Sequence, residues 1–185
     1  MHAPRLFPHC FWFTGLSGAG KSTLAYALCA VLRQQGSAAH VLDGDELRRG
    51  LCADLGLSEL DRRENIRRAG EVAKLFFDAG LVVICAFVSP YASDRARARS
   101  LFPAGRFIEV HFATPLTVCA ERDPKGHYAK AQAGQLSGLT GWDAPYETPV
   151  SPELVLDTQA TAVDAAVSQL LTLRAKNSNA TVGHA

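Results

Sequence analysis

One stretch near the start of the chain has the residue types and spacing that bind nucleotide phosphates. Residues 15–22 read GLSGAGKS, which matches the pattern G-x-x-x-x-G-K-[ST] in full. Its glycines let backbone N–H groups face phosphate oxygens, Lys21 can reach the β- and γ-phosphates, and the Ser22 hydroxyl can ligate Mg²⁺. The pattern predicts a site for Mg-ATP formed by Gly15, Leu16, Ser17, Gly18, Ala19, Gly20, Lys21, Ser22 and Thr23.

Two carboxylates follow the second apolar run of the chain, in Asp43-Gly44-Asp45. One of them can hold water on Mg²⁺, and the other can accept the proton of an attacking hydroxyl. A simple acidic turn before a helix would have the same sequence, because aspartate is a favoured N-cap. Arg48, one turn later, favours a pocket for an anion over a plain cap.

A dense charged run, DRRENIRR, occupies residues 61–68. A solvated helix face with i,i+3 and i,i+4 ion pairs explains most of such a run. However, Arg62 and Asn65 lie one turn apart and face the same way. Together they could bind a sulfate or phosphate group and a sugar hydroxyl.

The central apolar run of the chain ends in Val88-Ser89-Pro90. A serine at the end of a strand can hydrogen-bond a substrate, and a merely structural turn is the alternative. Arg95 and Arg99, four residues apart, could form a second cationic stripe or belong only to the surface.

Alternating strands and helices must position these residues. Apolar and β-branched runs predict strands at 11–14, 38–42, 81–88, 107–112 and 154–156, and helical periodicity predicts helices at 22–35, 58–80, 115–122 and 162–174. This order predicts an α/β fold, with a five-stranded parallel sheet covered by helices on both faces and ligands at the carboxyl ends of the strands. Residues 123–149 are long for a connector, which is typical of a mobile lid or a disordered insertion.

Composition narrows the class of protein further. The chain has 185 residues, 48% of them hydrophobic and 20% charged, and its net charge of +1 provides no global attraction to nucleic acid or a membrane surface. Five cysteines without a CxxC pair are expected to be reduced and to bind no zinc. Residues 1–10 lack the order of a signal peptide, and the longest apolar run is too short to span a bilayer. We expect one cytoplasmic domain over 1–185 that contains the phosphate-binding loop, with a frayed tail from Lys176.

Taken together, these residues resemble the adenylylsulfate kinase family. The matching blocks, in family order, are GLSGAGKST at 15–23, DGD at 43–45, DRRENIRR at 61–68, EVAKLF at 71–76, FVSPYASDRARAR at 87–99, RDPKG at 122–126, TG at 140–141, PYE at 145–147 and PELVL at 152–156. The resemblance implies a P-loop kinase fold, usually homodimeric, with a lid near 123–141. It also implies transfer of the γ-phosphoryl of ATP to the 3′-hydroxyl of adenylylsulfate, for sulfate assimilation or sulfation.

The resemblance also implies the roles of individual residues. Lys21, Asp45 and Ser89 are assigned to catalysis, and Ser22 and Asp43 to Mg²⁺. Ser89 matches the family's phosphoserine position, but positioning and charge neutralisation suffice for direct in-line transfer, so we interpret Ser89 as a substrate-binding residue. The family's substrate contacts fall on Asp43, Asp45, Arg48, Arg62, Asn65, Val88, Ser89 and Lys125.

The sequence departs from the family mainly on the acceptor side and in the lid. Where the family places two phenylalanines around the acceptor's adenine, this chain has Leu57 and Leu139. Glu46 replaces the asparagine of the usual DGDN, His127 replaces the leucine after RDPKG, and residues 129–132 read AKAQ in place of KKAR.

Two other functions stay open on the sequence alone. A divergent P-loop kinase could act on another small hydroxylated anion, since the departures cluster on the acceptor side. A regulatory module could bind ATP without turnover, although the pair Asp43 and Asp45 argues against it, because a sensor needs no base beside the γ-phosphate.

Overall fold

The computed structural model describes residues 7–180, with side chains through 178. Within this range, five parallel strands form one sheet in the order β2-β3-β1-β4-β5, which confirms the predicted fold class. The strands are β1 (Cys10–Gly15), β2 (Ala39–Asp43), β3 (Val82–Ala86), β4 (Phe107–Phe112) and β5 (Leu154–Leu156). The connections between strands run first toward β2, on one side of β1, and later toward β4, on its other side. A ligand is expected where this order switches, at the carboxyl end of β1.

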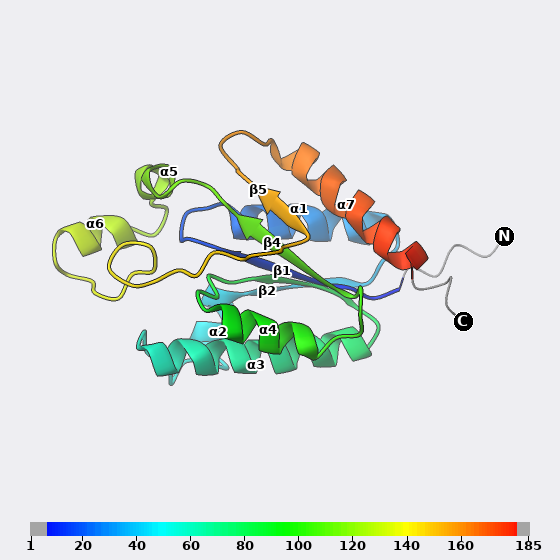
Figure 1. Cartoon of the computed structure of the whole chain (residues 1–185), viewed down its shortest axis with the longest axis horizontal. Helices are drawn as coiled ribbons and strands as arrows, with labels where there is room; N and C mark the ends of the chain where they lie inside the picture. The colour runs from blue at the N-terminus through cyan, green and yellow to red at the C-terminus, as the bar shows by residue number, and fades with distance from the viewer. Residues whose placement is uncertain (1–6, 181–185) are drawn as a thin grey trace.

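Side chains of β1 alternate between the two faces of the sheet, and each face is covered by helices (Figure 1). Phe11 and Phe13 pack into the cluster beneath α1 (Lys21–Gln34) and α7 (Val163–Ala180). Trp12 packs into the opposite cluster, beneath α3 (Glu59–Asp78) and α4 (Ala92–Ser100). Both faces are therefore buried, which explains why the central strands are almost continuously apolar.

The ends of α3 lie within two residues of their predicted positions. Ser58 is the N-cap, and its Oγ accepts a hydrogen bond of 3.2 Å from the backbone N–H of Asp61. The helix ends at Asp78, just before Gly80, whose φ of 89° is accessible mainly to glycine. The short helix α2 (Gly44–Arg49) directly follows β2, where the sequence predicted an acidic turn.

After β4 comes α5 (Leu116–Arg122), close to its predicted position, and the long connector that follows contains the short helix α6 (His127–Gln132). Both helices lie at one end of the molecule (Figure 1). Tyr128 of α6 is buried, and its hydroxyl donates to the backbone oxygen of Ser17 at 3.0 Å. This packing shows that the segment is ordered, so its interpretation as a disordered insertion is wrong. Short helices held by tertiary contacts leave only a weak periodic signal.

The prediction of a frayed tail from Lys176 is wrong for residues 176–180, because α7 continues through Ala180. Ser178 Oγ donates to the backbone oxygen of Arg174 at 3.0 Å and so supports this last turn. Residues 1–6 and 181–185 lie outside the described part of the chain. The prediction that residues 1–10 are not a signal peptide therefore falls mostly outside it.

The five cysteines are all buried, and none of them forms a disulfide. From residue 7 to residue 180, no helix has both the length and the apolar character required to cross a membrane.

Candidate active site

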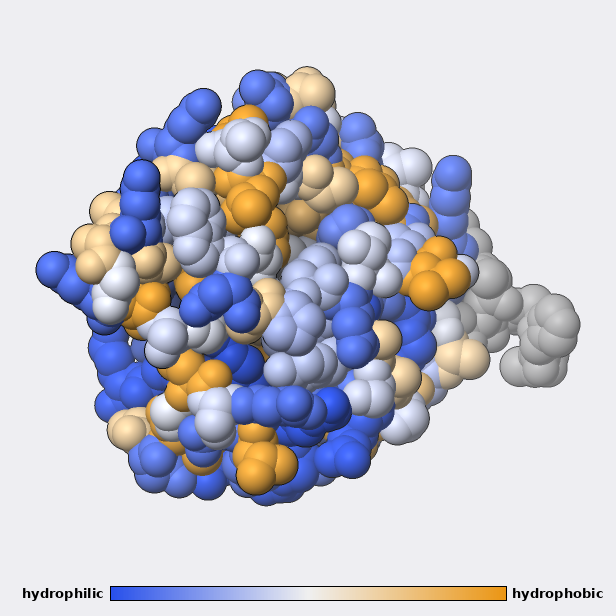
Figure 2. All heavy atoms as spheres, turned by 60° about the vertical axis from the view of Figure 1, so that its left-hand side comes forward, coloured by the Kyte–Doolittle hydropathy of each residue, from blue (hydrophilic) through white to orange (hydrophobic). Residues whose placement is uncertain are grey.

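A cavity of about 840 Å³ opens at the carboxyl edge of the sheet, a volume near the upper end for small-molecule sites. Figure 2 views the molecule from the side that carries α5 and α6, where small groups of hydrophobic side chains lie between hydrophilic ones. Gly15, Leu16 and Ala19 belong to the glycine-rich loop but do not line the cavity. The predicted site residues that line it are Ser17, Gly18, Gly20, Lys21, Ser22, Thr23, Asp43, Asp45, Arg48, Leu57, Arg62, Asn65, Val88, Ser89, Lys125 and Leu139.

The loop at 15–22 requires glycine for two separate reasons. Gly18 has a φ of 77°, and a Cβ there would lie 2.7 Å from the backbone oxygen of Cys119, so no side chain fits. Gly20 is the N-cap of α1 in a left-handed conformation, with a φ of 90°. The first N–H groups of α1 have no partner within the helix, and the residues that carry them line the cavity, so they can serve as anion donors.

Lys21 lies folded against the loop that it belongs to. Its Nζ donates to the backbone oxygens of Gly15 at 2.8 Å and Leu16 at 2.6 Å. Burial, helped by the positive charge of Lys125, lowers the pKa of Lys21 to about 8. Within the described residues, no carboxylate is hydrogen-bonded to this buried cation, although Asp43 and Asp45 lie near enough to favour its charge, and an incoming phosphate would pair with it directly.

Ser22 and Asp43 form an oxygen pair beside this lysine. Ser22 Oγ donates to Asp43 Oδ2 at 2.6 Å, and the other oxygen, Asp43 Oδ1, accepts from the backbone N–H of Asp45 at 2.8 Å. Asp43 is therefore the N-cap of α2, as the interpretation of a simple acidic turn requires, and it also lines the cavity. Two adjacent hard oxygen donors suit Mg²⁺, which takes its remaining ligands from water and phosphate.

Asp45 forms an ion pair with Lys125, which precedes α6. The pair joins α2 to the segment that follows α5, and both side chains line the cavity.

Arg122, which sequence reasoning did not assign, also lines the cavity, and its Nη1 donates to Thr158 Oγ1 at 2.7 Å. Thr158 in turn donates to the backbone oxygen of Ala19 at 3.0 Å, so this pair supports the glycine-rich loop. Nothing in the local sequence marks Thr158, because only the fold brings it to the loop.

At the other end of the cavity, two predicted anion-binding arginines donate to backbone oxygens. Arg48 Nη1 donates to Gly56 at 2.9 Å. Arg62 Nε donates to Leu57 at 3.0 Å, and its other nitrogens donate to Thr140 Oγ1 and to the backbone oxygen of Gly138. These contacts hold together the two loops that carry the leucines at 57 and 139.

Asn65 lies on the same face of α3 as Arg62, as the spacing predicted. It is buried against the cavity, and its Oδ1 has no hydrogen-bond partner within the described residues. A buried amide oxygen without a donor is costly, so a donor such as a ligand hydroxyl would complete it.

Ser89 occupies a strained position three residues after the end of β3. Its φ of 39° is uncommon for a residue other than glycine, and its Oγ accepts a hydrogen bond of 3.2 Å from Trp12 Nε1. Arg95 Nη1 donates to its backbone oxygen at 2.8 Å. Sequence reasoning missed Trp12, because a tryptophan inside an apolar run carries no sign of a polar role.

Arg95 and Arg99 do not form an unpaired cationic stripe, and the interpretation as plain surface is wrong for Arg95, whereas Arg99 stays partly exposed. Arg95 is buried and pairs with Glu109 at 2.8 Å, while Arg99 pairs with Glu153 at 2.6 Å. These arginines join α4 to β4 and to the segment before β5, so the ion pairs connect separate elements of the fold. By contrast, the run at 61–68 carries the expected surface pairs Arg63–Glu59, Arg67–Glu64 and Arg68–Glu64.

The strand order and the loop at 15–22 place the chain in the class of P-loop phosphotransferases. A gluconokinase from Sinorhizobium meliloti, at 21% identity and a TM-score of 0.63, has a similar fold. The family within this class is shown by comparison with more similar proteins. Residues 8–157 match the family model described as adenylylsulphate kinase, and the chain belongs to this family.

Named relatives agree with the family model. The adenylyl-sulfate kinase of Marinobacter nauticus is 57% identical over 164 residues, which cover 89% of this chain and 82% of the relative. That of Shewanella amazonensis is 61% identical over 160 residues, covering 86% and 81%. The solved structure of the Mycobacterium tuberculosis APS kinase with AMPPNP and APS has a TM-score of 0.86 and 46% identity, and the match covers 90% of this chain and 97% of that one.

Proposed function

We propose that this chain transfers the γ-phosphoryl of ATP to the ribose 3′-hydroxyl of adenylylsulfate, giving 3′-phosphoadenylylsulfate for sulfate assimilation. The observation that carries the proposal is the single cavity that joins the phosphate-binding loop to the predicted acceptor residues. Relatives named adenylyl-sulfate kinase, at 57% and 61% identity, support the choice of acceptor. We give these relatives more weight than the two leucines, Leu57 and Leu139, that stand where the family has phenylalanines around the acceptor's adenine.

On the donor side, the loop N–H groups and Lys21 hold the phosphates of ATP. Lys21 would exchange its contacts with backbone oxygens for contacts with the β- and γ-phosphates, where its charge offsets the negative charge of the transferred group. Arg122 and Thr158 line the cavity beside the loop and support its conformation.

Ser22 and Asp43 would hold Mg²⁺, directly or through water. When bound, the ion neutralises phosphate charge and helps to orient the γ-phosphoryl. Opening the short Ser22–Asp43 hydrogen bond frees two oxygens for this role.

On the acceptor side, Asp45 would orient the 3′-hydroxyl and accept its proton. Arg48, Arg62 and Lys125 supply positive charge for the anionic acceptor, and the buried oxygen of Asn65 would accept a hydrogen bond from a ribose hydroxyl or adenine amine. Because Arg62 and Lys125 already have partners in this structure, binding requires these side chains to exchange contacts.

Ser89 would act as a positioning group in a direct transfer. Its hydroxyl is buried and already accepts a hydrogen bond from Trp12, which supports a fixed binding role over that of a nucleophile. Direct in-line transfer needs no covalent intermediate.

We further propose that residues 123–141 act as a lid and that the enzyme works in the cytoplasm as a homodimer formed by one kinase domain per chain. The ion pair between Asp45 and Lys125 supports the lid, because it links this segment to the acceptor side. The homodimer and the location rest on the family resemblance.

A thermal-shift screen tests the proposed acceptor. In saturating Mg-ADP, adenylylsulfate should raise the melting temperature more than AMP does, and gluconate should have no effect. Asn65→Ala should reduce the adenylylsulfate shift, while Arg67→Gln, an exposed change on the same helix, should not. A response to gluconate but not to adenylylsulfate would favour a kinase of another hydroxylated anion.

A further inference from the structure

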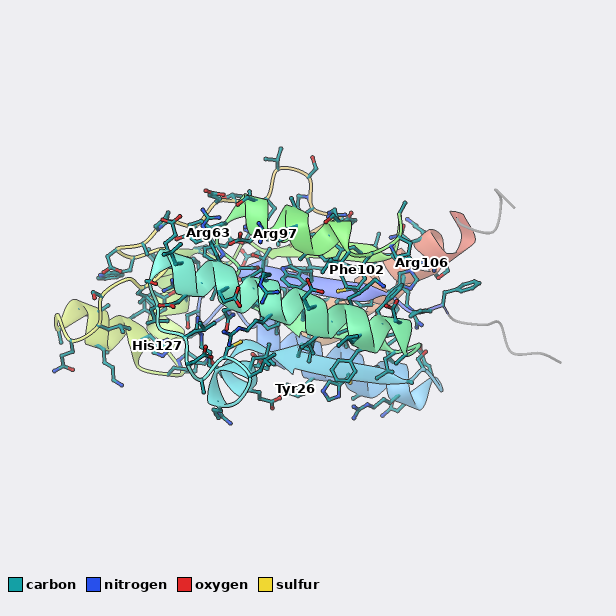
Figure 3. The ribbon with its side chains drawn as sticks, turned by 90° about the horizontal axis from the view of Figure 1, so that it is seen from below. Tyr26, Arg63, Arg97, Phe102, Arg106 and His127 are labelled. Atoms are coloured by element: carbon teal, nitrogen blue, oxygen red, sulfur yellow. The ribbon has the colours of Figure 1, made fainter. Side chains whose placement is uncertain are left out.

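A group of three basic side chains lies buried at the end of the sheet opposite the cavity. His9 directly precedes β1, Arg106 directly precedes β4, and Arg174 lies near the end of α7. Their exposed fractions are 0%, 7% and 3%. Figure 3 shows Arg106 far from His127 of α6 along the molecule. The length of β1, roughly 20 Å, separates this cluster from the glycine-rich loop.

The three side chains of this cluster meet around Phe7. His9 Nδ1 lies 3.0 Å from the backbone oxygen of Phe7, and Arg174 Nη2 donates to the same oxygen at 3.3 Å. The Arg106 guanidinium carbon lies 4.6 Å from the centre of the Phe7 ring. The backbone oxygen of Arg106 accepts from the N–H of Cys10 at 2.8 Å, which fixes the starts of β1 and β4 beside each other.

Among the described residues, no negatively charged side chain is paired with this cluster. Burial is the main cause that lowers the pKa of Arg106 and of Arg174, and no carboxylate among the described residues counteracts it. Of the six buried side-chain polar atoms without a hydrogen-bond partner in the described part of the chain, three are here: His9 Nε2, Arg106 Nη1 and Arg174 Nε. Two buried guanidiniums without a counter-charge are unfavourable, and an anion bound between them would remove that cost.

His9 restricts which anions could bind in this cluster. The Phe7 oxygen can only accept, so the proton of the neutral ring is on Nδ1, and Nε2 is left as an acceptor. Burial, with smaller contributions from the nearby arginines, lowers the pKa of His9 to about 4, so the ring is neutral near pH 7. The complementary ligand offers charged oxygens to the guanidiniums and an O–H to Nε2. Hydrogen phosphate has both, whereas sulfate has no O–H.

We propose that His9, Arg106 and Arg174 form a binding site for inorganic phosphate, separate from the active site. The two guanidiniums donate to its charged oxygens, and its remaining O–H donates to Nε2 of the histidine. The bound anion links the starts of β1 and β4 to the end of α7, so it stabilises the folded protein by mass action.

Thermal unfolding in saturating Mg-ADP, which fills the glycine-rich loop, tests this site. At ten times its dissociation constant, phosphate should raise the melting temperature of the wild type by about 4 °C. Arg174→Gln should lose this shift, and Arg97→Gln, an exposed change on α4 (Figure 3), should keep it. An equal phosphate shift in Arg174→Gln and wild type would overturn the proposal. Sulfate should give less than half of the phosphate shift, and an equal effect would contradict the acceptor role of His9.

A second measurement does not depend on any variant being able to fold. Crystals of the wild-type protein soaked in arsenate, which has the shape and protonation of phosphate, should show an anomalous peak between Arg106 and Arg174. A peak confined to the glycine-rich loop would overturn the proposal.

Discussion

At the scale of single residues, Lys21 is a buried cation whose charge a bound nucleotide would stabilise. Its ammonium group is buried among backbone oxygens, and burial lowers its pKa to about 8. The charged form is therefore disfavoured in the free protein, and the phosphates of a nucleotide would favour it again.

From the lowered pKa of Lys21, we predict that the protein takes up a proton when it binds nucleotide above about pH 8. Above about pH 8 the free protein has lost the Lys21 proton, whereas the Mg-ADP complex retains it, so affinity should fall as pH rises through 8. Calorimetry at pH 8.5, in two buffers of different ionisation enthalpy, measures the uptake. Lys21→Ala should weaken binding and abolish the buffer dependence. Equal heats in the two buffers for the wild type would contradict the assignment.

The contact between Trp12 and Ser89 predicts a role for a residue outside the recognised motifs. Trp12→Phe keeps an aromatic ring but removes the N–H that donates to Ser89. We expect KM for the acceptor to rise about three- to tenfold, equivalent to a lost hydrogen bond of about 1 kcal/mol, with a smaller change in kcat. Ser89→Ala should have a similar effect.

Steady-state kinetics with varied acceptor measures this split between KM and kcat. A chemically competent phosphoenzyme on Ser89 would contradict direct transfer, and loss of kcat alone in both variants would contradict the acceptor-binding role of Ser89.

At the scale of elements, Arg62 holds together the two loops that border the acceptor end of the cavity. It donates to the backbone oxygens of Leu57 and Gly138, and the side chains of Leu57 and Leu139 both line the cavity. Leu57 is 43% exposed and Leu139 only 8% exposed, so the two sides of this end differ in their access to water.

Aromatic residues at these two positions should improve acceptor binding. Stacking on a base contributes about 1–3 kcal/mol, and leucine provides only apolar contact. The double change Leu57→Phe with Leu139→Phe should therefore lower KM for adenylylsulfate by about tenfold or more. Single variants separate the exposed position from the buried one. If the double change blocks turnover of the native acceptor and does nothing for adenylylsulfate, the acceptor is not a nucleotide.

At the scale of the whole molecule, local pattern predicted the elements well. The strand Phe107–Phe112, the cap at Ser58 and the glycine-rich loop depend on residues that are near each other in sequence, so they could be identified without a structure. The cavity residues named from motifs also lie together.

What the sequence could not predict depends on residues that meet only after folding. The pairing of Arg95 with Glu109, the contact of Trp12 with Ser89 and the cluster around Phe7 all join distant segments. The extent of α7 was underestimated for a related reason, since polar residues at its end gave no apolar periodicity.

The steady-state rate of ADP formation from Mg-ATP with adenylylsulfate as acceptor is the most direct test of the proposed function. The wild type should turn over with a kcat/KM for adenylylsulfate far above that for AMP. Lys21→Ala should lose at least 100-fold in kcat, as about 3 kcal/mol of transition-state stabilisation is removed, and Asp45→Asn should also lose most of its kcat. Wild-type protein that binds Mg-ADP but does not turn over adenylylsulfate would contradict the proposed function, and so would Lys21→Ala within tenfold of wild type.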